Sequence, residues 1–198
     1  MLNRQELRNS LRSQRRELSP QQHASASIQL AEHIASSRYF LNSQHIAFYL
    51  PNDGETDLQP LIEYAWQMKK QCYLPVLGLR NSRRLWFLPY QAETNLIPNR
   101  FGIPEPQHAN RDRLLKPFTL DLILMPLVAF DSQGNRLGMG GGFYDRTLGF
   151  LIHRQHWHKP RLFGTAFSFQ HVTRLDRQPW DVPLDGIATE QDITLFRR

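Results

Sequence analysis

The hydrophobic positions of this chain change their period several times, which predicts helices that alternate with strands. Apolar residues recur at helical spacing over residues 3–17 and 19–36 and again after Thr56. The segment Ser19-Pro20-Gln21-Gln22 is a helix start, with an N-cap serine, proline at the first helical position and a glutamine that can close a capping box. The residues of this helix that we expect to be buried are Ala24, Ile28, Ala31 and Ala35.

The third predicted helix follows the first strand and is capped by Thr56 or Asp57. Its expected buried residues are Leu61, Ile62, Ala65 and Met68. Glu55 stands just before it, where a glutamate can simply complement the helix dipole.

Short apolar runs bounded by turn residues predict the strands, because they are too short for helices. These runs cover residues 45–50, 71–76, 85–90, 122–125, 161–167, 186–189 and 193–195. Strands that alternate with helices predict an α/β fold with a largely parallel sheet, which binds its ligands at the carboxyl ends of the strands. A length of 198 residues suits a single domain, residues 1–198.

Residues 120–148, LDLILMPLVAFDSQGNRLGMGGGFYDRTL, have the residue types of a phosphate-binding site. A buried strand leads through a polar turn to the glycine cluster 138–142, and a helical pattern runs from Tyr144 to about His153. Glycines let backbone N–H groups approach a phosphate, Arg136 can pair with it, and Asp145 can hold a nucleotide's Mg²⁺. A glycine-rich turn alone is more often structural, and neither the Walker nor the GxGxxG spacing fits.

Composition and charge narrow the possible partners. No stretch approaches the roughly 20 apolar residues of a membrane span, so we expect no membrane contact. The single cysteine, Cys72, excludes an internal disulfide and suits a cytoplasmic protein. A formal charge of +6 favours anionic partners, but the basic residues beyond the first twenty positions are scattered and form no nucleic-acid motif. We expect no nucleic acid and no obligate protein partner.

Two groups of residues have simpler interpretations when taken alone. Arg4 and Arg8 share one helix face, and a solvated basic face would explain them, as it would explain the neighbouring Arg12, Arg15 and Arg16. The spacing of the histidines at 153, 156 and 158 does not place them on one helix face, which argues against a metal site.

The pattern AFDxxGxRLGxGGGFYDR resembles the signature of the 5-formyltetrahydrofolate cyclo-ligase family, also called methenyltetrahydrofolate synthetase. Further matches follow in order over nearly the whole chain: Tyr49-Leu50-Pro51 with Glu55-Thr56, Tyr73-Leu74-Pro75, residues 101–106 and residues 180–185. The resemblance implies a three-layer Rossmann-like domain. It also implies an enzyme that uses ATP and Mg²⁺ to convert 5-formyltetrahydrofolate, which can carry a polyglutamate tail, to 5,10-methenyltetrahydrofolate, ADP and phosphate.

The resemblance also implies roles for individual residues. The expected ATP contacts are Arg4, Arg8, Arg136, Leu137, Gly138, Met139, Gly140, Gly141, Gly142, Phe143 and Tyr144. The expected folate contacts are Leu50, Glu55, Met139, Gly140, Gly141, Gly142 and Phe143. Asp145 and Asp181 are the expected Mg²⁺ ligands, and Arg136 and Tyr144 are the expected catalytic residues.

Two positions depart from the family pattern. Many members carry lysine where Gly141 stands and tyrosine where Phe143 stands, so this chain lacks a cation near the phosphates and a hydroxyl. Two alternatives stay open. One is a basic nucleotide- or RNA-binding module without catalysis, whose nucleic-acid affinity would fall steeply with salt. The other is a sugar-phosphate isomerase or acyl-CoA-type transferase, in which Asp145 would act as a base.

Overall fold

A seven-stranded sheet forms the centre of the computed structural model, which describes residues 3–78, 82–107, 115–152 and 159–196. The strand order is β11–β10–β9–β6–β1–β2–β3. Strands β10, β9, β6, β1 and β2 run parallel, and β11 and β3 are antiparallel edge strands. Their bounds are β1 His45–Ala47, β2 Gln71–Leu77, β3 Leu85–Pro89, β6 Leu122–Pro126, β9 Arg161–Thr165, β10 Gly186–Ala188 and β11 Ile193–Leu195. The prediction of an α/β fold with a largely parallel sheet is confirmed.

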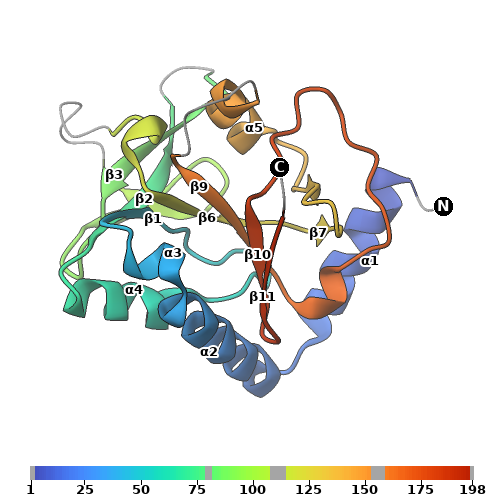
Figure 1. Cartoon of the computed structure of the whole chain (residues 1–198), viewed down its shortest axis with the longest axis horizontal. Helices are drawn as coiled ribbons and strands as arrows, with labels where there is room; N and C mark the ends of the chain where they lie inside the picture. Colours follow the sequence, from blue (N-terminus) through green and yellow to red (C-terminus); the bar gives the residue numbers. More distant parts are fainter. Residues whose placement is uncertain (1–2, 79–81, 108–114, 153–158, 197–198) are drawn as a thin grey trace.

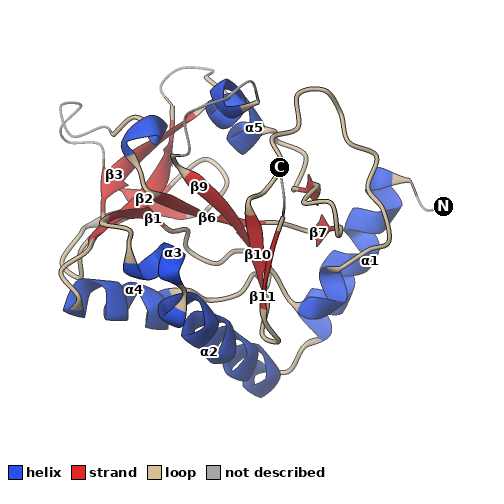
Figure 2. Cartoon of the chain, viewed as in Figure 1, coloured by secondary structure: helices blue, strands red, loops and turns tan. Residues whose placement is uncertain are grey.

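Helices cover the sheet from two sides (Figures 1 and 2). One face is covered by α2 (Pro20–Ser36), α3 (Arg38–Leu41) and α4 (Gln59–Gln67). The other face carries α5 (Phe143–Leu148) and the 3₁₀ turn η3 (Gly149–Leu151), with the further short turns η2 (Pro117–Thr119) and η4 (Ser168–Gln170) in the connections. Along β6, Leu122 and Leu124 face the first layer while Ile123 and Met125 face the second. A strand buried on both faces therefore explains the continuous apolar run.

Helix α1 (Arg4–Glu17) lies beside the sheet, against a small hairpin of β7 (Ala129–Phe130) and β8 (Arg136–Leu137) (Figure 1). Leu11 of the helix packs with Val128 and Leu137 in a separate apolar cluster. A second two-stranded ribbon pairs β4 (Leu96–Pro98) with β5 (Pro104–Pro106). The β7–β8 hairpin lies in the chain between β6 and the glycine segment 138–142, so this segment follows the hairpin and not β6 itself. None of the described helices is long and apolar enough to span a membrane.

The predicted buried face of α2 is partly wrong. The capping box at Ser19 is present, but the buried residues of this helix are Ser27, Leu30, Ala31 and Ile34. Ala31 is confirmed, whereas Ile28 is 48% exposed and Ala24 is also exposed. The helix turns Leu30 and Ile34 toward the sheet, which buries more apolar surface than a stripe of alanines would.

Two helix boundaries also differ from the prediction. Helix α4 begins at Gln59 and its N-cap is Leu58, so the predicted cap at Thr56 or Asp57 is wrong, although Asp57 Oδ1 accepts the N–H of Gln59 at 2.9 Å. The helix ends at Gln67, so Met68 leaves the helical register and is 38% exposed, while the other three predicted residues are buried. Helix α5 ends at Leu148 and passes into η3, and its predicted end at position 153 lies outside the described residues.

The α2 correction predicts different costs for two substitutions on one helix. Leu30→Ala removes a fully buried side chain and should lower the free energy of unfolding by about 2–5 kcal/mol. Ile28→Ala removes a half-exposed one and should change it by about 1 kcal/mol or less. Urea unfolding followed by circular dichroism measures both, and equal losses would contradict the observed orientation of α2.

Candidate active site

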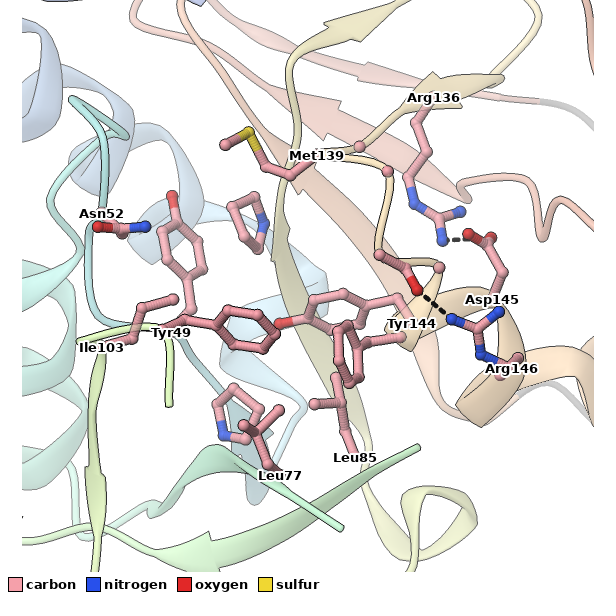
Figure 3. Close-up of a pocket in the computed structure, with 18 of the residues that line it drawn as sticks. Tyr49, Asn52, Leu77, Leu85, Ile103, Arg136, Met139, Tyr144, Asp145 and Arg146 are labelled. Atoms are coloured by element: carbon pink, nitrogen blue, oxygen red, sulfur yellow. Dashed lines mark hydrogen bonds and ion pairs between the residues drawn. The ribbon is translucent and has the colours of Figure 1, made fainter. Parts of the chain in front are cut away.

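Loops at the carboxyl ends of the parallel strands meet the glycine segment around one cavity of about 960 Å³. The loop after β1 contributes Tyr49, Asn52 and Glu55. Figure 3 shows Arg136, Asp145 and Arg146 on one side, Tyr49, Asn52 and Ile103 on the other, and Tyr144 between them. The predicted residues that line the cavity are Arg4, Arg8, Leu50, Glu55, Arg136, Gly138, Met139, Gly140, Gly141, Gly142, Phe143, Tyr144, Asp145 and Asp181. This is the sheet edge at which open α/β folds bind ligands.

Leu137 is the exception among the predicted residues. Its side chain is buried with Leu11 and Val128, and its carbonyl accepts the N–H of Val128 at 2.7 Å. Leu137 therefore fastens the start of the glycine segment to the core.

Asp131 forms the turn that precedes this segment. The residue is fully buried, and its Oδ1 accepts the N–H groups of Gln133 and Asn135, both at 3.0 Å. Its Oδ2 accepts the N–H of Leu175 and the side-chain amide of Asn135, both at 2.9 Å. Gly134 completes the turn with a φ of 80° that favours glycine. The aspartate of the sequence signature thus shapes the hairpin that carries Arg136.

Arg136 and Asp145 form a largely buried ion pair at one end of the cavity. Arg136 Nη2 lies 2.6 Å from Asp145 Oδ1, and the same guanidinium donates to the carbonyl of Val182. Asp145 Oδ1 also accepts the N–H of Val182 at 3.1 Å. Because Asp181 precedes Val182, these bonds bring both predicted Mg²⁺ ligands to the same end of the cavity.

Helix α1 directs two arginines to the same end. Arg4 Nη1 lies 3.6 Å from Asp181 Oδ2 and donates to the carbonyl of Asp176 at 3.1 Å. Arg8 Nε donates to the carbonyl of Gly138 at 2.9 Å. Partial burial and, to a smaller extent, repulsion from Arg4 lower the pKa of Arg8. No carboxylate among the described residues forms an ion pair with Arg8. The simple interpretation of these two arginines as a solvated face is therefore wrong.

The glycine segment is shaped by positive backbone angles and close side chains. Gly140 and Gly142 have φ values of 96° and 62°, which other residues rarely adopt. A β-carbon at Gly141 would lie 2.8 Å from the ring of Phe143. This ring packs edge to face against Phe101, with 5.9 Å between ring centroids. Positions 141 and 143 are thus in contact, so the ring at 143 limits the size of the residue at 141.

Arg146 is a cavity residue that the sequence analysis missed. Its guanidinium donates to the carbonyl of Gly141 (Figure 3) and lies against Gly142, where a β-carbon would be 3.1 Å from Nη1. A second bond joins its Nε to the carbonyl of Arg83 at 3.3 Å. An arginine four residues after Gly142, one turn along a helix, is the signal that could have identified it.

A buried carboxyl lies toward the other side of the cavity. Glu55 is 8% exposed, and its Oε2 accepts the N–H of Asn52 at 3.1 Å. Burial raises the pKa of Glu55 to about 7. Glu55 precedes α4 by four residues, so complementing the helix dipole does not explain it. Burial also raises the pKa of Tyr144, with further increases from Glu55 and Tyr49, so its phenol is neutral.

The remaining candidates give no second site in the described part of the chain. No group of three or more possible metal ligands is found there, and positions 153, 156 and 158 lie outside it. Arg12, Arg15 and Arg16 were expected to be solvated, but all three bind Asp53. The expectation is wrong for Arg15, which is only 2% exposed, whereas the side chain of Arg16 is 56% exposed as well as paired.

Comparison with known proteins matches one family over nearly the whole chain. The model of the 5-formyltetrahydrofolate cyclo-ligase family matches residues 1–190. The 5-formyltetrahydrofolate cyclo-ligase of Escherichia coli (strain K12) is 40% identical over 185 residues, which cover 92% of this chain and 98% of the relative. That of Haemophilus influenzae is 39% identical over 186 residues, covering 93% and 96%.

Solved structures show the same fold. The NMR structure of 5,10-methenyltetrahydrofolate synthetase from Aquifex aeolicus matches with a TM-score of 0.82 and 31% identity, covering 100% of this chain and 94% of that one. A 5,10-methenyltetrahydrofolate synthetase from Mycoplasma pneumoniae matches with a TM-score of 0.72 at 24% identity, covering 96% and 99%.

The pKa of Glu55 predicts a dependence of stability on pH. Glu55 holds its proton more tightly in the folded protein than at its ordinary pKa of 4.5, so between about pH 4.5 and 7 the folded state binds more protons. Its contribution to the free energy of unfolding therefore falls as the pH rises through this range. Glu55→Gln removes the contribution, so the variant should gain stability relative to wild type between pH 5 and pH 8. Urea unfolding at both pH values tests this, and a constant difference would contradict it.

Proposed function

Because this chain is an enzyme of the 5-formyltetrahydrofolate cyclo-ligase family, we propose that it uses Mg-ATP to convert 5-formyltetrahydrofolate to 5,10-methenyltetrahydrofolate, ADP and phosphate. One observation carries the proposal: a single cavity joins an arginine- and glycine-rich end to a side with apolar residues and a buried carboxyl. The first suits a triphosphate and the second suits a largely uncharged ring system. Both reactants would then meet at the glycine segment.

The ATP phosphates would lie between α1 and the glycine segment. Arg4, Arg8 and Arg136 supply positive charge there, and glycines allow the backbone to come close to phosphate oxygens. The remaining proposed contacts are the backbone and side chains of residues 137–144. Leu137 would take part through its backbone, since its side chain is in the core.

Asp145 and Asp181 would hold Mg²⁺. The pair fits the ion, because both are carboxylates and Mg²⁺ in nucleotide sites is bound by one or two carboxylates together with phosphate oxygens. Each carboxylate already faces an arginine, which would share it with the ion. When bound, Mg²⁺ would offset negative charge on the phosphates.

The folate would occupy the side of the cavity near the loop after β1. Leu50 and Glu55 would contact it, together with residues 139–143 of the glycine segment. Ile103 adds apolar surface beside Tyr49, and Leu77 and Leu85 add more along the lower edge of the cavity in Figure 3. Glu55 titrates near neutrality, so it can donate or accept a hydrogen bond to a polar edge of the ring.

The proposed reaction has two steps. The formyl oxygen attacks the γ-phosphorus of ATP, and ADP leaves. N10 then attacks the formyl carbon and releases its proton, and the former formyl oxygen leaves with the phosphate as the ring closes. The protein aligns the reactants and offsets charge at the transferring group, which requires no nucleophilic side chain. Arg136 and the neutral Tyr144 are the proposed transition-state stabilisers, through guanidinium and phenol hydrogen bonds.

The proposal predicts an optical signal that requires Mg-ATP. Purified protein with 5-formyltetrahydrofolate should develop the absorbance of 5,10-methenyltetrahydrofolate only when Mg-ATP is present. Asp145→Asn should reduce kcat/KM by about 100-fold or more, because it removes a proposed Mg²⁺ ligand and the carboxylate that orients Arg136. Glu32→Gln changes an exposed carboxylate of α2 outside the cavity and serves as the control. A folded wild-type protein that gives no signal would refute the proposed function.

Arg8 offers a separate test of the ATP site. Arg8→Gln removes a charged donor that has no carboxylate partner among the described residues, so KM for ATP should rise about 10- to 100-fold, as expected for a charge-assisted hydrogen bond. KM for the folate should change little. Arg38→Gln removes an equal charge from an exposed position on α3 outside the cavity and should leave both constants unchanged. Equal effects from the two variants would indicate a general charge effect instead of a contact.

A further inference from the structure

We propose that Asp53 is a positioning residue that couples the two substrate sides of the cavity, by fixing the arginine-bearing helix α1 to the loop after β1. The inference rests on the proposed function, which places ATP beside α1 and the folate beside this loop. Asp53 itself does not line the cavity, so its effect would be transmitted through the residues that do.

Three arginines of one helix converge on this single carboxylate. Asp53 Oδ2 lies 2.6 Å from Arg12 Nε and 3.0 Å from Arg15 Nη2, and Oδ1 accepts from Arg16 Nε at 2.6 Å. Arg15 Nε also donates to the carbonyl of Asp53 at 2.9 Å. Burial acts to raise the pKa of Asp53, but hydrogen bonds from Arg12 and Arg16 outweigh it and lower the pKa to about 2. The carboxylate is therefore ionised throughout the neutral range.

The same contacts hold a backbone shape that is otherwise unfavourable. Asp53 and Gly54 have consecutive positive φ values of 53° and 74°, and the first is uncommon for a residue with a side chain. A β-carbon at Gly54 would lie 3.4 Å from Arg15, so the helix rests directly against this turn. His23 Nε2 lies 3.1 Å from the carbonyl of Gly54. The ionic cluster and the turn therefore support one another.

The ionic cluster of Asp53 with Arg12, Arg15 and Arg16 joins two elements, helix α1 and the loop after β1, and each element carries residues of one side of the cavity. On α1, Arg4 and Arg8 lie one to three turns before the arginines that bind Asp53. On the loop, Asn52 and Glu55 flank the Asp53–Gly54 turn. A helix transmits displacement along its length, so the cluster at one end sets where the arginines at the other end stand relative to the loop. Loss of the cluster should loosen both substrate sides together.

Steady-state kinetics with both substrates tests this coupling. In Asp53→Asn we expect KM for ATP and KM for 5-formyltetrahydrofolate to rise together, by about 3- to 10-fold, with kcat changed by less than about 2-fold. Arg16→Gln, which removes the most exposed of the three arginines, should show the same pattern more weakly, and Arg16→Lys should restore it at least in part. Lys159→Gln breaks an exposed ion pair with Asp121 and should change neither KM.

The outcomes separate the possible explanations. A lower melting temperature of Asp53→Asn with both KM values unchanged would make the cluster purely structural and overturn the inference, as would a rise in one KM alone. If Asp53→Asn does not fold, Arg16→Gln and its lysine counterpart decide the question. If the wild-type protein forms no product, the proposed function fails, and calorimetric binding of ATP and of 5-formyltetrahydrofolate to the same variants tests the coupling directly. Unchanged affinities in that experiment would overturn it.

Discussion

The site depends on the hydrogen bonds that the buried side chain of Asp131 accepts. A carboxyl group in the interior is costly unless its oxygens are hydrogen-bonded, and here four N–H donors satisfy them. These bonds fold the β7–β8 hairpin and bring residue 175 against it. The hairpin places Arg136, Arg136 orients Asp145, and Asp145 holds the backbone beside Asp181. A single turn thus connects segments from three parts of the chain.

The charges of the cavity are unevenly distributed. Arg8 and Arg146 approach the glycine segment from two helices, and each donates to a carbonyl of that segment with no carboxylate partner in the described part of the chain. A guanidinium bonded to a neutral carbonyl gains a stronger partner when a phosphate arrives. Glu55 reduces the negative charge at the other side because burial favours its protonated form. The cavity is therefore positively charged at the end proposed for phosphate, while the side proposed for the ring carries only the partial charge of Glu55 near neutral pH.

The sequence allowed much of the fold to be predicted, because apolar runs and helical periods are local signals. The β6 strand, the capped start of α2 and the parallel sheet follow from such signals. The orientation of α2 and the burial of Arg15 could not be predicted, because each depends on a partner distant in sequence. The sequence around Arg15 does not distinguish it from a surface arginine, because its partner Asp53 lies 38 residues later in the chain. Whether a charged side chain is buried is decided by the partners that satisfy it.

The candidate site likewise combines features that the local sequence predicts with features that depend on contacts in the folded chain. The signature located the glycine segment, and family membership sets aside a binding module without catalysis. The signature could not show that its aspartate shapes a turn, that Leu137 belongs to the core, or that Arg146 reaches back to Gly141.

The two departures from the family pattern illustrate why single positions mislead. Considered alone, glycine at 141 removes a cation and phenylalanine at 143 removes a hydroxyl. In the folded chain, a β-carbon at Gly141 would lie 2.8 Å from the Phe143 ring, so a larger residue at 141 requires a shift of this ring, which also packs against Phe101. Arg146 meanwhile brings a cation to the carbonyl of the same glycine from the following helix. Because Arg146 belongs to the family signature, α5 supplies positive charge at this segment even though position 141 has no lysine.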